Sequence, residues 1–462
     1  MMFTRKAALV AVALAALLAT SGCAGANTGG SGGTGGSTPG AASSSASLAG
    51  TTLNVLMVGN PQMNDLKSLT AQDFTAKTGI NVNYTVLPEN ELRDKVAQDI
   101  ATQAGQYDVA TIGAFEASVW MNNDWLTDLQ PYAAQDTTFD VSDILPPMAS
   151  LLSKGSDMYA IPFYGESAFM MYRKDLFQQY GLTMPANPTW TDILNLAKQL
   201  KTKLPSSVSP ICLRGLAGWG ENMAVIGSMQ NAFGGGFFTQ DWQPMAESAG
   251  TVNAVTFYNN LITNYGEPGA AQSGFTECLN TFSQGKAAMW FDATSAATTL
   301  ESPNASKVVG KVGYAAAPTD KMRSGWLWSW AWTVPKTTKH VDAAWAFISW
   351  ASSKDYEQEA MSQLGRVPDG KRTSTASIPA YQTASAAYEA PMMAAINASD
   401  PDNCQMQKSP APGCQYLAIP EFENLGTQIG QEMANMVAGK ETVAQASSKA
   451  LTYEQAVAAK HK

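Results

Sequence analysis

The chain has 462 residues, of which 45% are hydrophobic and 15% charged, enough apolar material for a large folded core of two or three domains. Its formal net charge of −9 argues against nucleic acid as a partner, because that binding depends on Lys and Arg that neutralise phosphates. The chain has only two His, and His461 lies next to its C-terminus. We therefore expect no metal site, no cofactor and no Ser-His-Asp triad.

The first residues have the pattern of a targeting segment. A basic pair, Arg5 and Lys6, precedes an apolar run at 7–19 that is too short to span a bilayer, which predicts a secretory signal peptide. The small residues before Cys23 resemble the bacterial lipobox, in which the cysteine becomes lipidated. Thr20 stands where that motif usually has an aliphatic residue, and an ordinary secretory cleavage site is the alternative.

A low-complexity segment follows Cys23. It consists almost entirely of Gly, Ser, Thr and Ala, a composition that cannot form a core and that predicts a flexible tether with an end-to-end distance of roughly 25–30 Å. We therefore expect residues 1–22 to be a signal peptide and residues 23–50 to be a lipid-anchored linker. This places the folded part on the extracellular face of the cytoplasmic membrane.

Four further cysteines belong to the folded part of the exported chain, where oxidising conditions favour disulfides. Three pairings are possible. Cys404 and Cys414 bracket a loop rich in Pro and Gly, which favours a disulfide between them and leaves Cys212 to pair with Cys278.

From residue 51 onward, strand and helix patterns alternate. Strands are predicted at 53–58, 80–87 and 107–112, with helices at 65–77 and 91–103 between them. This order implies a mostly parallel sheet with helices on both faces, and ligands of such sheets bind beyond the carboxyl ends of the strands. Further along, we expect an extended crossover at 159–164, helices at 189–202, 251–265 and 340–352, and an extended aromatic segment at 320–335.

Four tryptophans alternate along that aromatic segment, at positions 326, 328, 330 and 332. In a strand, all four would face one side. Core packing is one explanation, but each buried indole N–H then needs an acceptor. A carbohydrate fits such a surface, because it offers C–H faces to the rings and hydroxyls to the polar rim. We expect at least one of these tryptophans to contact a ligand in an aromatic-lined pocket.

The sequence also carries a series of short motifs over residues 51–440. On these motifs the chain resembles the extracellular solute-binding proteins (family 1) of bacterial ABC importers, and within that family the mannitol and sorbitol (polyol) branch. The motifs include Tyr107-Asp108-Val109, Trp125-Leu126-Thr127-Asp128-Leu129, Tyr159-Ala160-Ile161-Pro162, Thr189-Trp190-Thr191-Asp192, Gly285-Lys286-Ala287-Ala288-Met289 and, for the branch, Asn60-Pro61-Gln62-Met63, Gly218-Trp219-Gly220-Glu221-Asn222, Phe291-Asp292-Ala293-Thr294 and Gly365-Arg366-Val367-Pro368.

The resemblance implies an α/β, two-lobed periplasmic-binding-protein-like fold of type II, with interleaved lobes and a hinge between them. It places the first lobe at 51–163 and 290–324 and the second at 164–289 and 325–462. It further implies a monomer that captures a small carbohydrate or polyol between its lobes and delivers it to the membrane permease of an ABC transporter. The membrane would be contacted through the lipid anchor only.

The resemblance also implies a set of ligand-binding residues, whose carboxylates, amides and guanidinium groups would replace the water lost by ligand hydroxyls. Glu221 could instead cap a helix, Arg214 could form a surface ion pair, and Arg366 could only tie down its loop. The set consists of Asn60, Gln62, Tyr164, Glu166, Arg214, Trp219, Glu221, Asp292, Trp326, Trp328 and Arg366.

Three other functions remain open at the level of sequence. A secreted carbohydrate-active enzyme could use Glu166 and Asp292 as a carboxylate pair, since glycosidases place two carboxylates about 5–9 Å apart. A receptor of the same fold could bind an oligosaccharide. A metal-binding receptor would need a Tyr, His and carboxylate cluster, for which the two His are poorly placed.

Overall fold

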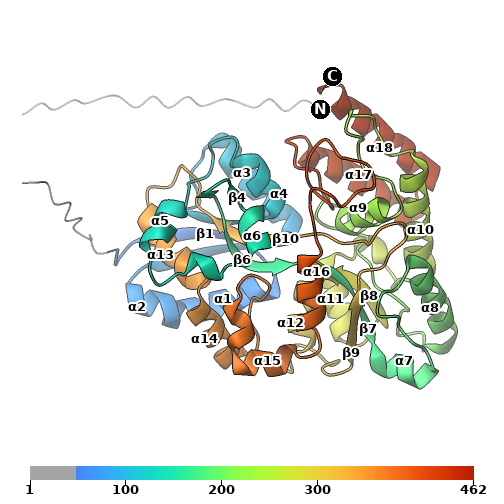
Figure 1. The fold of residues 1–462 in the computed structure, drawn as a ribbon, viewed down its shortest axis with the longest axis horizontal. Coiled ribbons are helices and arrows are strands. Elements are labelled where there is room, and N and C mark those ends of the chain that lie inside the picture. The colour runs from blue at the N-terminus through green and yellow to red at the C-terminus, as the bar shows by residue number, and fades with distance from the viewer. Residues whose placement is uncertain (1–47, 462) are drawn as a thin grey trace, which may run out of the picture. The chain divides into compact units, whose positions relative to one another are not determined.

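The computed structural model describes residues 48–461, so the predicted signal peptide, Cys23 and nearly all of the predicted linker lie outside the described residues. The described residues belong to one compact unit, within which two β-sheets mark two lobes (Figure 1). No helix between residues 48 and 461 is long and apolar enough to cross a bilayer.

The first sheet has five strands in the order β2-β1-β3-β10-β6. β1 pairs in parallel with both β2 and β3, which confirms the predicted parallel arrangement, whereas β10 runs antiparallel to β3 and β6. The strands are β1 (Thr52–Val58), β2 (Asn81–Leu87), β3 (Val109–Ile112), β6 (Ile161–Glu166) and β10 (Trp328–Thr333), and a separate hairpin comprises β4 (Ser153–Lys154) and β5 (Asp157–Met158).

Helices of the first lobe pack on both sides of this sheet. α1 begins at Pro61, whose missing N–H and fixed φ suit the first helical position, and runs on without a break to Thr78. The elements are α1 (Pro61–Thr70), η1 (Ala71–Thr75), α2 (Ala76–Thr78), α3 (Glu89–Thr102), α4 (Ala114–Trp120), α5 (Gln130–Gln135), η2 (Val141–Asp143), α6 (Pro146–Leu151), α13 (Val341–Ala351), α14 (Lys354–Leu364), η5 (Ser374–Ser377) and α15 (Pro379–Ser385).

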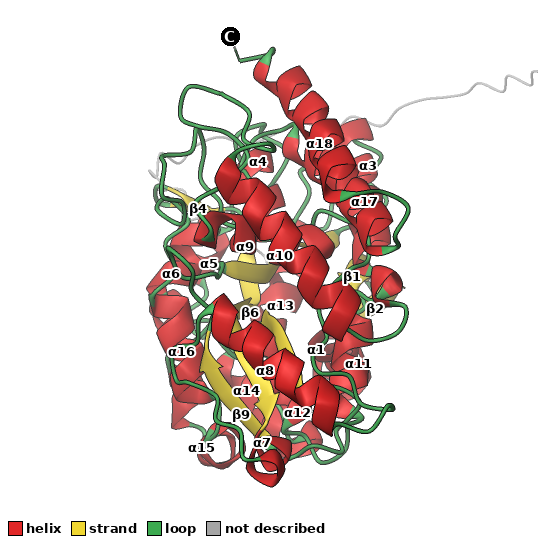
Figure 2. Ribbon diagram, turned by 90° about the vertical axis from the view of Figure 1, so that its right-hand side faces the viewer, coloured by secondary structure: helices red, strands yellow, loops and turns green. Residues whose placement is uncertain are grey.

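The second sheet has three antiparallel strands in the order β8-β7-β9. Figure 2 shows α8 in front of this sheet, where Trp190 of α8 packs edge-on against Phe291 of β8. The elements of this lobe are β7 (Ala168–Arg173), β8 (Met289–Ala293), β9 (Val312–Ala316), α7 (Lys174–Tyr180), α8 (Trp190–Lys203), α9 (Asn222–Ala232), α10 (Ala249–Tyr265), η3 (Ala270–Gln272), α11 (Phe275–Ser283), η4 (Thr294–Ala296), α12 (Ala297–Leu300), α16 (Glu389–Asn397), α17 (Phe422–Val437) and α18 (Val443–Ala458).

The strand pairing runs opposite to the expected assignment of two segments to lobes. β8 and β9 lie within 290–324, apart from the first residue of β8, yet they pair with β7 in the second sheet. β10 lies within 325–462, yet it pairs with β3 and β6 in the first sheet. The helix that follows it also belongs there, since Phe347 of α13 packs against Phe74. The strand pairing therefore favours a different assignment of these segments from the one that the resemblance implied.

The tryptophans of β10 have different surroundings. The register with β6 shifts between Trp330 and Ala331, where the pairing passes over Phe163 of β6. Trp332 packs in the core against Phe163 and Phe347, whereas Trp328 and Trp330 line a cavity. The four tryptophans therefore do not all line one pocket, since Trp332 belongs to the core.

Candidate functional site

A cavity lies beyond the carboxyl end of β1 and beside the segments that connect the two sheets. Both lobes contribute to its wall, which is mostly polar and aromatic. Its lining residues are Asn60, Glu89, Arg93, Tyr164, Glu166, Arg214, Gly220, Ala224, Phe275, Ala293, Ser295, Trp326, Trp328, Trp330 and Gln415.

Arg214 is held in the cavity wall by a fully buried carboxylate. Its Nε lies 3.1 and 3.0 Å from the two carboxylate oxygens of Asp292. Asp292 also accepts from the indole N–H of Trp290 at 2.9 Å and the backbone N–H of Ala293 at 2.7 Å. Glu221 Oε2 lies 3.7 Å from Nη1 of Arg214. Because every oxygen of Asp292 is occupied, this carboxylate fixes the guanidinium and does not face the cavity.

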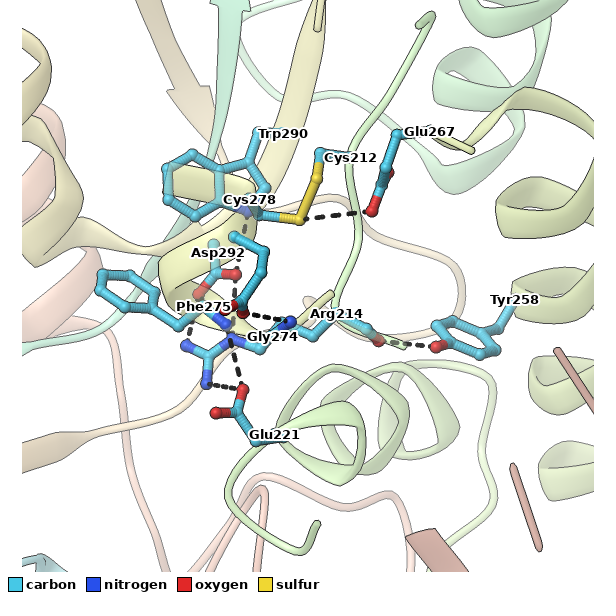
Figure 3. The surroundings of a disulfide bond; sticks show 11 residues. Cys212, Arg214, Glu221, Tyr258, Glu267, Gly274, Phe275, Cys278, Trp290 and Asp292 are labelled. Carbon is cyan, nitrogen blue, oxygen red and sulfur yellow. Dashed lines mark hydrogen bonds and ion pairs between the residues drawn. A yellow bond between two sulfur atoms is a disulfide. The ribbon is translucent and has the colours of Figure 1, made fainter. Parts of the chain in front are cut away.

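A disulfide lies directly behind this cluster (Figure 3). It joins Cys212, two residues before Arg214, to Cys278 on α11. Phe275, at the start of α11, lines the cavity and donates its backbone N–H to Glu221 at 3.0 Å. The predicted pairing of Cys212 with Cys278 is confirmed, as is that of Cys404 with Cys414. The first bond ties the loop that carries Arg214 to the helix that carries Phe275.

Glu166, at the end of β6, is buried in the wall. Burial raises its pKa to about 8, so the carboxyl is mostly protonated at neutral pH and can donate as well as accept a hydrogen bond. It accepts a hydrogen bond from the hydroxyl of Ser295. Gln62 of the first lobe holds the segment that carries Ser295. Its Nε2 donates to the Ser295 carbonyl at 3.1 Å and to Thr298 Oγ1 at 3.2 Å.

Asn60 and Tyr164 form a second polar element of the wall. Asn60 follows β1 and precedes α1, so it lies at the carboxyl edge of the sheet, where α/β proteins bind ligands. Its Nδ2 donates to the phenolic oxygen of Tyr164 at 2.7 Å. The Tyr164 hydroxyl keeps its own proton for a further acceptor. Burial, with the nearby Glu166, holds its pKa well above the usual value.

Arg93 on α3 is held by two carboxylates and by indole rings. Its Nε and Nη2 donate to Glu89 at 3.2 and 2.8 Å, and its Nη1 donates to Glu116. The guanidinium carbon lies 3.8 Å from the ring centroid of Trp219 and 4.7 Å from that of Trp330. Such stacking combines cation–π attraction with a fixed orientation of the donors. Trp219 belongs to the loop before α9, so this contact joins the two lobes.

Two indole N–H groups at or just behind the cavity wall have no partner. Those of Trp219 and Trp326 are buried and have no hydrogen-bond partner among residues 48–461. Trp328 sits close to the backbone of Gly113, where a Cβ would lie 1.8 Å from its ring, so a side chain at this position would displace the indole. Because Trp326 lines the cavity, its N–H can donate to a ligand hydroxyl there.

Family comparison supports a binding role. The model of the bacterial extracellular solute-binding protein family matches residues 60–358. The chain belongs to this family. Its members are the extracellular binding proteins of bacterial transporters, so the resemblance seen in the sequence is confirmed.

Individual relatives agree with the family. A mannitol-binding protein of Pseudomonas aeruginosa is 39% identical over 394 residues, covering 84% of this chain and 89% of that protein. A solved ABC-transporter solute-binding protein of Agrobacterium vitis, with bound D-mannitol, matches with a TM-score of 0.85 at 42% identity, covering 89% of this chain and 99% of that one. A ribitol complex from Agrobacterium radiobacter matches with a TM-score of 0.77 at 25% identity, covering 89% and 99%. The predicted two-lobed α/β fold is thereby confirmed.

The structure brings most of the predicted ligand-binding residues to this cavity, in two layers. Six line it directly: Asn60, Tyr164, Glu166, Arg214, Trp326 and Trp328. Four others lie behind the lining and hold it in place: Gln62 through Ser295, Asp292 and Glu221 through Arg214, and Trp219 through Arg93. Glu221 gives no side-chain cap to α9, and Arg214 is no surface ion pair, so neither of those alternatives holds.

Arg366 does not reach the cavity. Its Nε and Nη2 donate to Asp65 on α1 at 2.6 and 2.8 Å, so it ties the end of α14 to α1 within the first lobe. This agrees with the alternative that it secures its own loop.

Sequence reasoning missed several lining residues. Glu89 and Arg93 carried a usable signal, because they are four residues apart at the start of the helix that follows a predicted strand. Trp330 belonged to a run already noticed. Ser295 and Gln415 carried no such signal in the sequence, since their place in the wall depends on how segments far apart in the chain meet. The residues missed are Glu89, Arg93, Gly220, Ala224, Phe275, Ala293, Ser295, Trp330 and Gln415.

Proposed function

We propose that this chain is the substrate-binding component of an ABC importer that captures an acyclic sugar alcohol, with mannitol as the leading candidate. The observation that carries the proposal is the wall of the cavity, where indole faces alternate with fixed hydrogen-bonding groups. Each ligand hydroxyl taken from water needs a partner, at a cost of about 1–3 kcal/mol when it has none. The mannitol complex of the Agrobacterium vitis relative supports the choice of ligand.

Intrinsic tryptophan fluorescence tests this proposal directly, because four of the chain's tryptophans line the cavity or lie just behind it (Trp219, Trp326, Trp328 and Trp330). We expect purified protein to give a saturable change with mannitol at micromolar concentrations, or about −8 kcal/mol. Sorbitol, arabitol, ribitol, glucose and maltose provide the comparison. Saturation with maltose alone would refute the polyol assignment and retain a sugar receptor.

We further propose that the chain binds its ligand without turning it over. An enzyme would need Glu166 and Asp292 on either side of a scissile bond. Asp292 is fully buried, and its oxygens are taken up by Arg214, Trp290 and Ala293. Hydrolysis of chromogenic glycosides that is lost in Glu166→Gln would contradict this proposal.

We also propose a lipid anchor at Cys23 and delivery of the ligand to a membrane permease. The support is the lipobox-like pattern before Cys23 and the tether after it. We expect the expressed protein to fractionate with membranes, and Cys23→Ser to release it. A protein that is soluble with Cys23 intact would leave ordinary secretion as the explanation. We also expect the protein to be a monomer, and light scattering measures its mass in solution.

We propose revised lobe boundaries on the strand pairing. The first lobe would hold 51–166 and 328–388, and the second 167–327 and 389–462, with the hinge where the chain passes between the lobes at Ser167, near Trp326 and between α15 and α16. Small-angle scattering with and without ligand checks the closure that such a hinge allows.

A further inference from the structure

The loop between α16 and α17 brings one more polar side chain into the cavity wall. Gln415 lines the cavity and is 5% exposed. Its Oε1 is buried and has no hydrogen-bond partner within the part of the chain that the structure describes. A buried amide oxygen without a partner is costly, which points to a donor supplied from outside the chain.

The backbone at Gln415 and at the residue before it is held in place by covalent and packing contacts. The preceding residue, Cys414, is bonded to Cys404, and its carbonyl accepts from Nδ2 of Asn231 on α9 at 2.6 Å. The backbone of Gln415 passes so close to α9 that a Cβ at Gly227 would lie 3.1 Å from its carbonyl oxygen. The amide therefore projects from a backbone that has little freedom to move.

The residue after Gln415 fixes the loop to the rest of the cavity. The ring of Tyr416 packs edge-on against Trp328, at 5.8 Å between centroids, and against Phe115 of α4, at 5.7 Å. Gln415 thus lies between a disulfide and an aromatic cluster that also holds a cavity tryptophan.

We propose that Gln415 is a selectivity-determining ligand contact, and that the Cys404–Cys414 disulfide positions it. The inference rests on the proposed polyol-binding function. Oε1 accepts a hydrogen bond from one ligand hydroxyl. The N–H of Trp326, also unpaired in this wall, supplies a donor. A polyol hydroxyl can donate to the first and accept from the second, whereas an analogue without that hydroxyl strands a buried acceptor.

The test measures dissociation constants of mannitol and of monodeoxy hexitols for the purified protein and for Gln415→Leu, which keeps most of the side-chain volume. We expect Gln415→Leu to weaken mannitol binding roughly tenfold to a hundredfold. One deoxy analogue should lose affinity for the unaltered protein and show no further loss with Gln415→Leu, the coupling expected of a direct contact. Gln407→Leu, at an exposed position of the same disulfide ring, is the matched control and should change nothing.

Each contrary result has a separate meaning. If the unaltered protein binds no polyol, both the proposed function and this inference are overturned. If it binds mannitol and Gln415→Leu binds equally well, the function stands and the inference falls. If Gln415→Leu weakens all analogues by one common factor, Gln415 is structural and the contact is refuted. Thermal unfolding without ligand shows whether the variant is folded.

The positioning role has its own measurement. Replacing both cysteines, Cys404→Ser with Cys414→Ser, should weaken mannitol binding severalfold in the unaltered background. It should have no added effect in the Gln415→Leu background, because the side chain that the disulfide positions is then absent. Equal losses in the two backgrounds would refute this role.

Discussion

The cavity wall holds two buried arginines that are fixed in different ways. Arg214 is bound by Asp292 and Glu221, and all three belong to the second lobe. Arg93 is bound by Glu89 and Glu116 of the first lobe, but its face stacks on Trp219 from the loop before α9. The first cluster can persist when the lobes separate, whereas the second contains a contact that opening would break. A buried arginine can thus either stiffen one lobe, as Arg214 does, or hold the two lobes together, as Arg93 does.

The largest expected effect concerns the buried partner of Arg214. Asp292→Asn leaves the guanidinium with a neutral amide in a site closed to water, which should lower the free energy of unfolding by about 3–5 kcal/mol. Urea denaturation measures this loss. Asp124→Asn is the matched control, since Asp124 pairs with Lys336 at the surface and its side chain is 82% exposed, so a change of at most about 0.5 kcal/mol is expected. Similar losses in the two variants would contradict the role given to Asp292.

The pH dependence of stability tests the two buried carboxyl groups near Arg214, those of Glu166 and Glu221. Burial raises the pKa of Glu166 to about 8, and burial together with the nearby Glu89 raises the pKa of Glu221 to about 8. Between the ordinary pKa of 4.5 and about 8, the folded state holds protons that the unfolded state has released. Stability should therefore fall as the pH rises across this window and become level above it.

Unfolding by urea at several pH values from 5 to 9 provides the measurement. Glu166→Gln should make the decline shallower, because a side chain that cannot ionise no longer contributes to it. Glu247→Gln, at an exposed position, should leave the slope unchanged. A slope that is the same in Glu166→Gln and in the unaltered protein would show that Glu166 does not contribute.

Arg93→Lys tests the contact between the lobes. An ammonium group keeps the charge but loses the planar stacking on Trp219 and the forked donation to Glu89. Because the stacking joins the two lobes around the cavity, polyol affinity should fall by about 0.5–2 kcal/mol, measured by fluorescence titration. Arg173→Lys is the matched control, since Arg173 pairs with Asp175 away from the cavity. Equal affinity in both variants would leave Arg93 without a role in closure.

The smallest effect is expected at Arg366, which pairs with Asp65 outside the cavity. Arg366→Ala should leave the dissociation constant of the polyol unchanged within error and cost about 0–1 kcal/mol of stability. Isothermal titration calorimetry and urea denaturation check the two parts. A tenfold loss of affinity would restore Arg366 to the ligand-binding set.

Local sequence patterns by themselves determined much of this protein. Apolar periodicity located β1, α3 and β2 to within a few residues, because the burial of one face fixes the spacing of apolar side chains. The resemblance of short motifs then predicted the family, and six of its eleven implied ligand residues line the cavity. The loop composition around Cys404 and Cys414 predicted their disulfide.

Tertiary structure alone decided the rest. A strand pattern does not name its sheet, so the lobes of β8, β9 and β10 required the observed pairing. Trp332 packs in the core while Trp328 and Trp330 line the cavity, a difference that alternation in the sequence cannot show. Contacts between residues far apart in the chain place Asp292 behind Arg214, and they place Gln415 in the cavity wall. Whether a polar side chain meets the ligand or holds one that does depends on those long-range contacts.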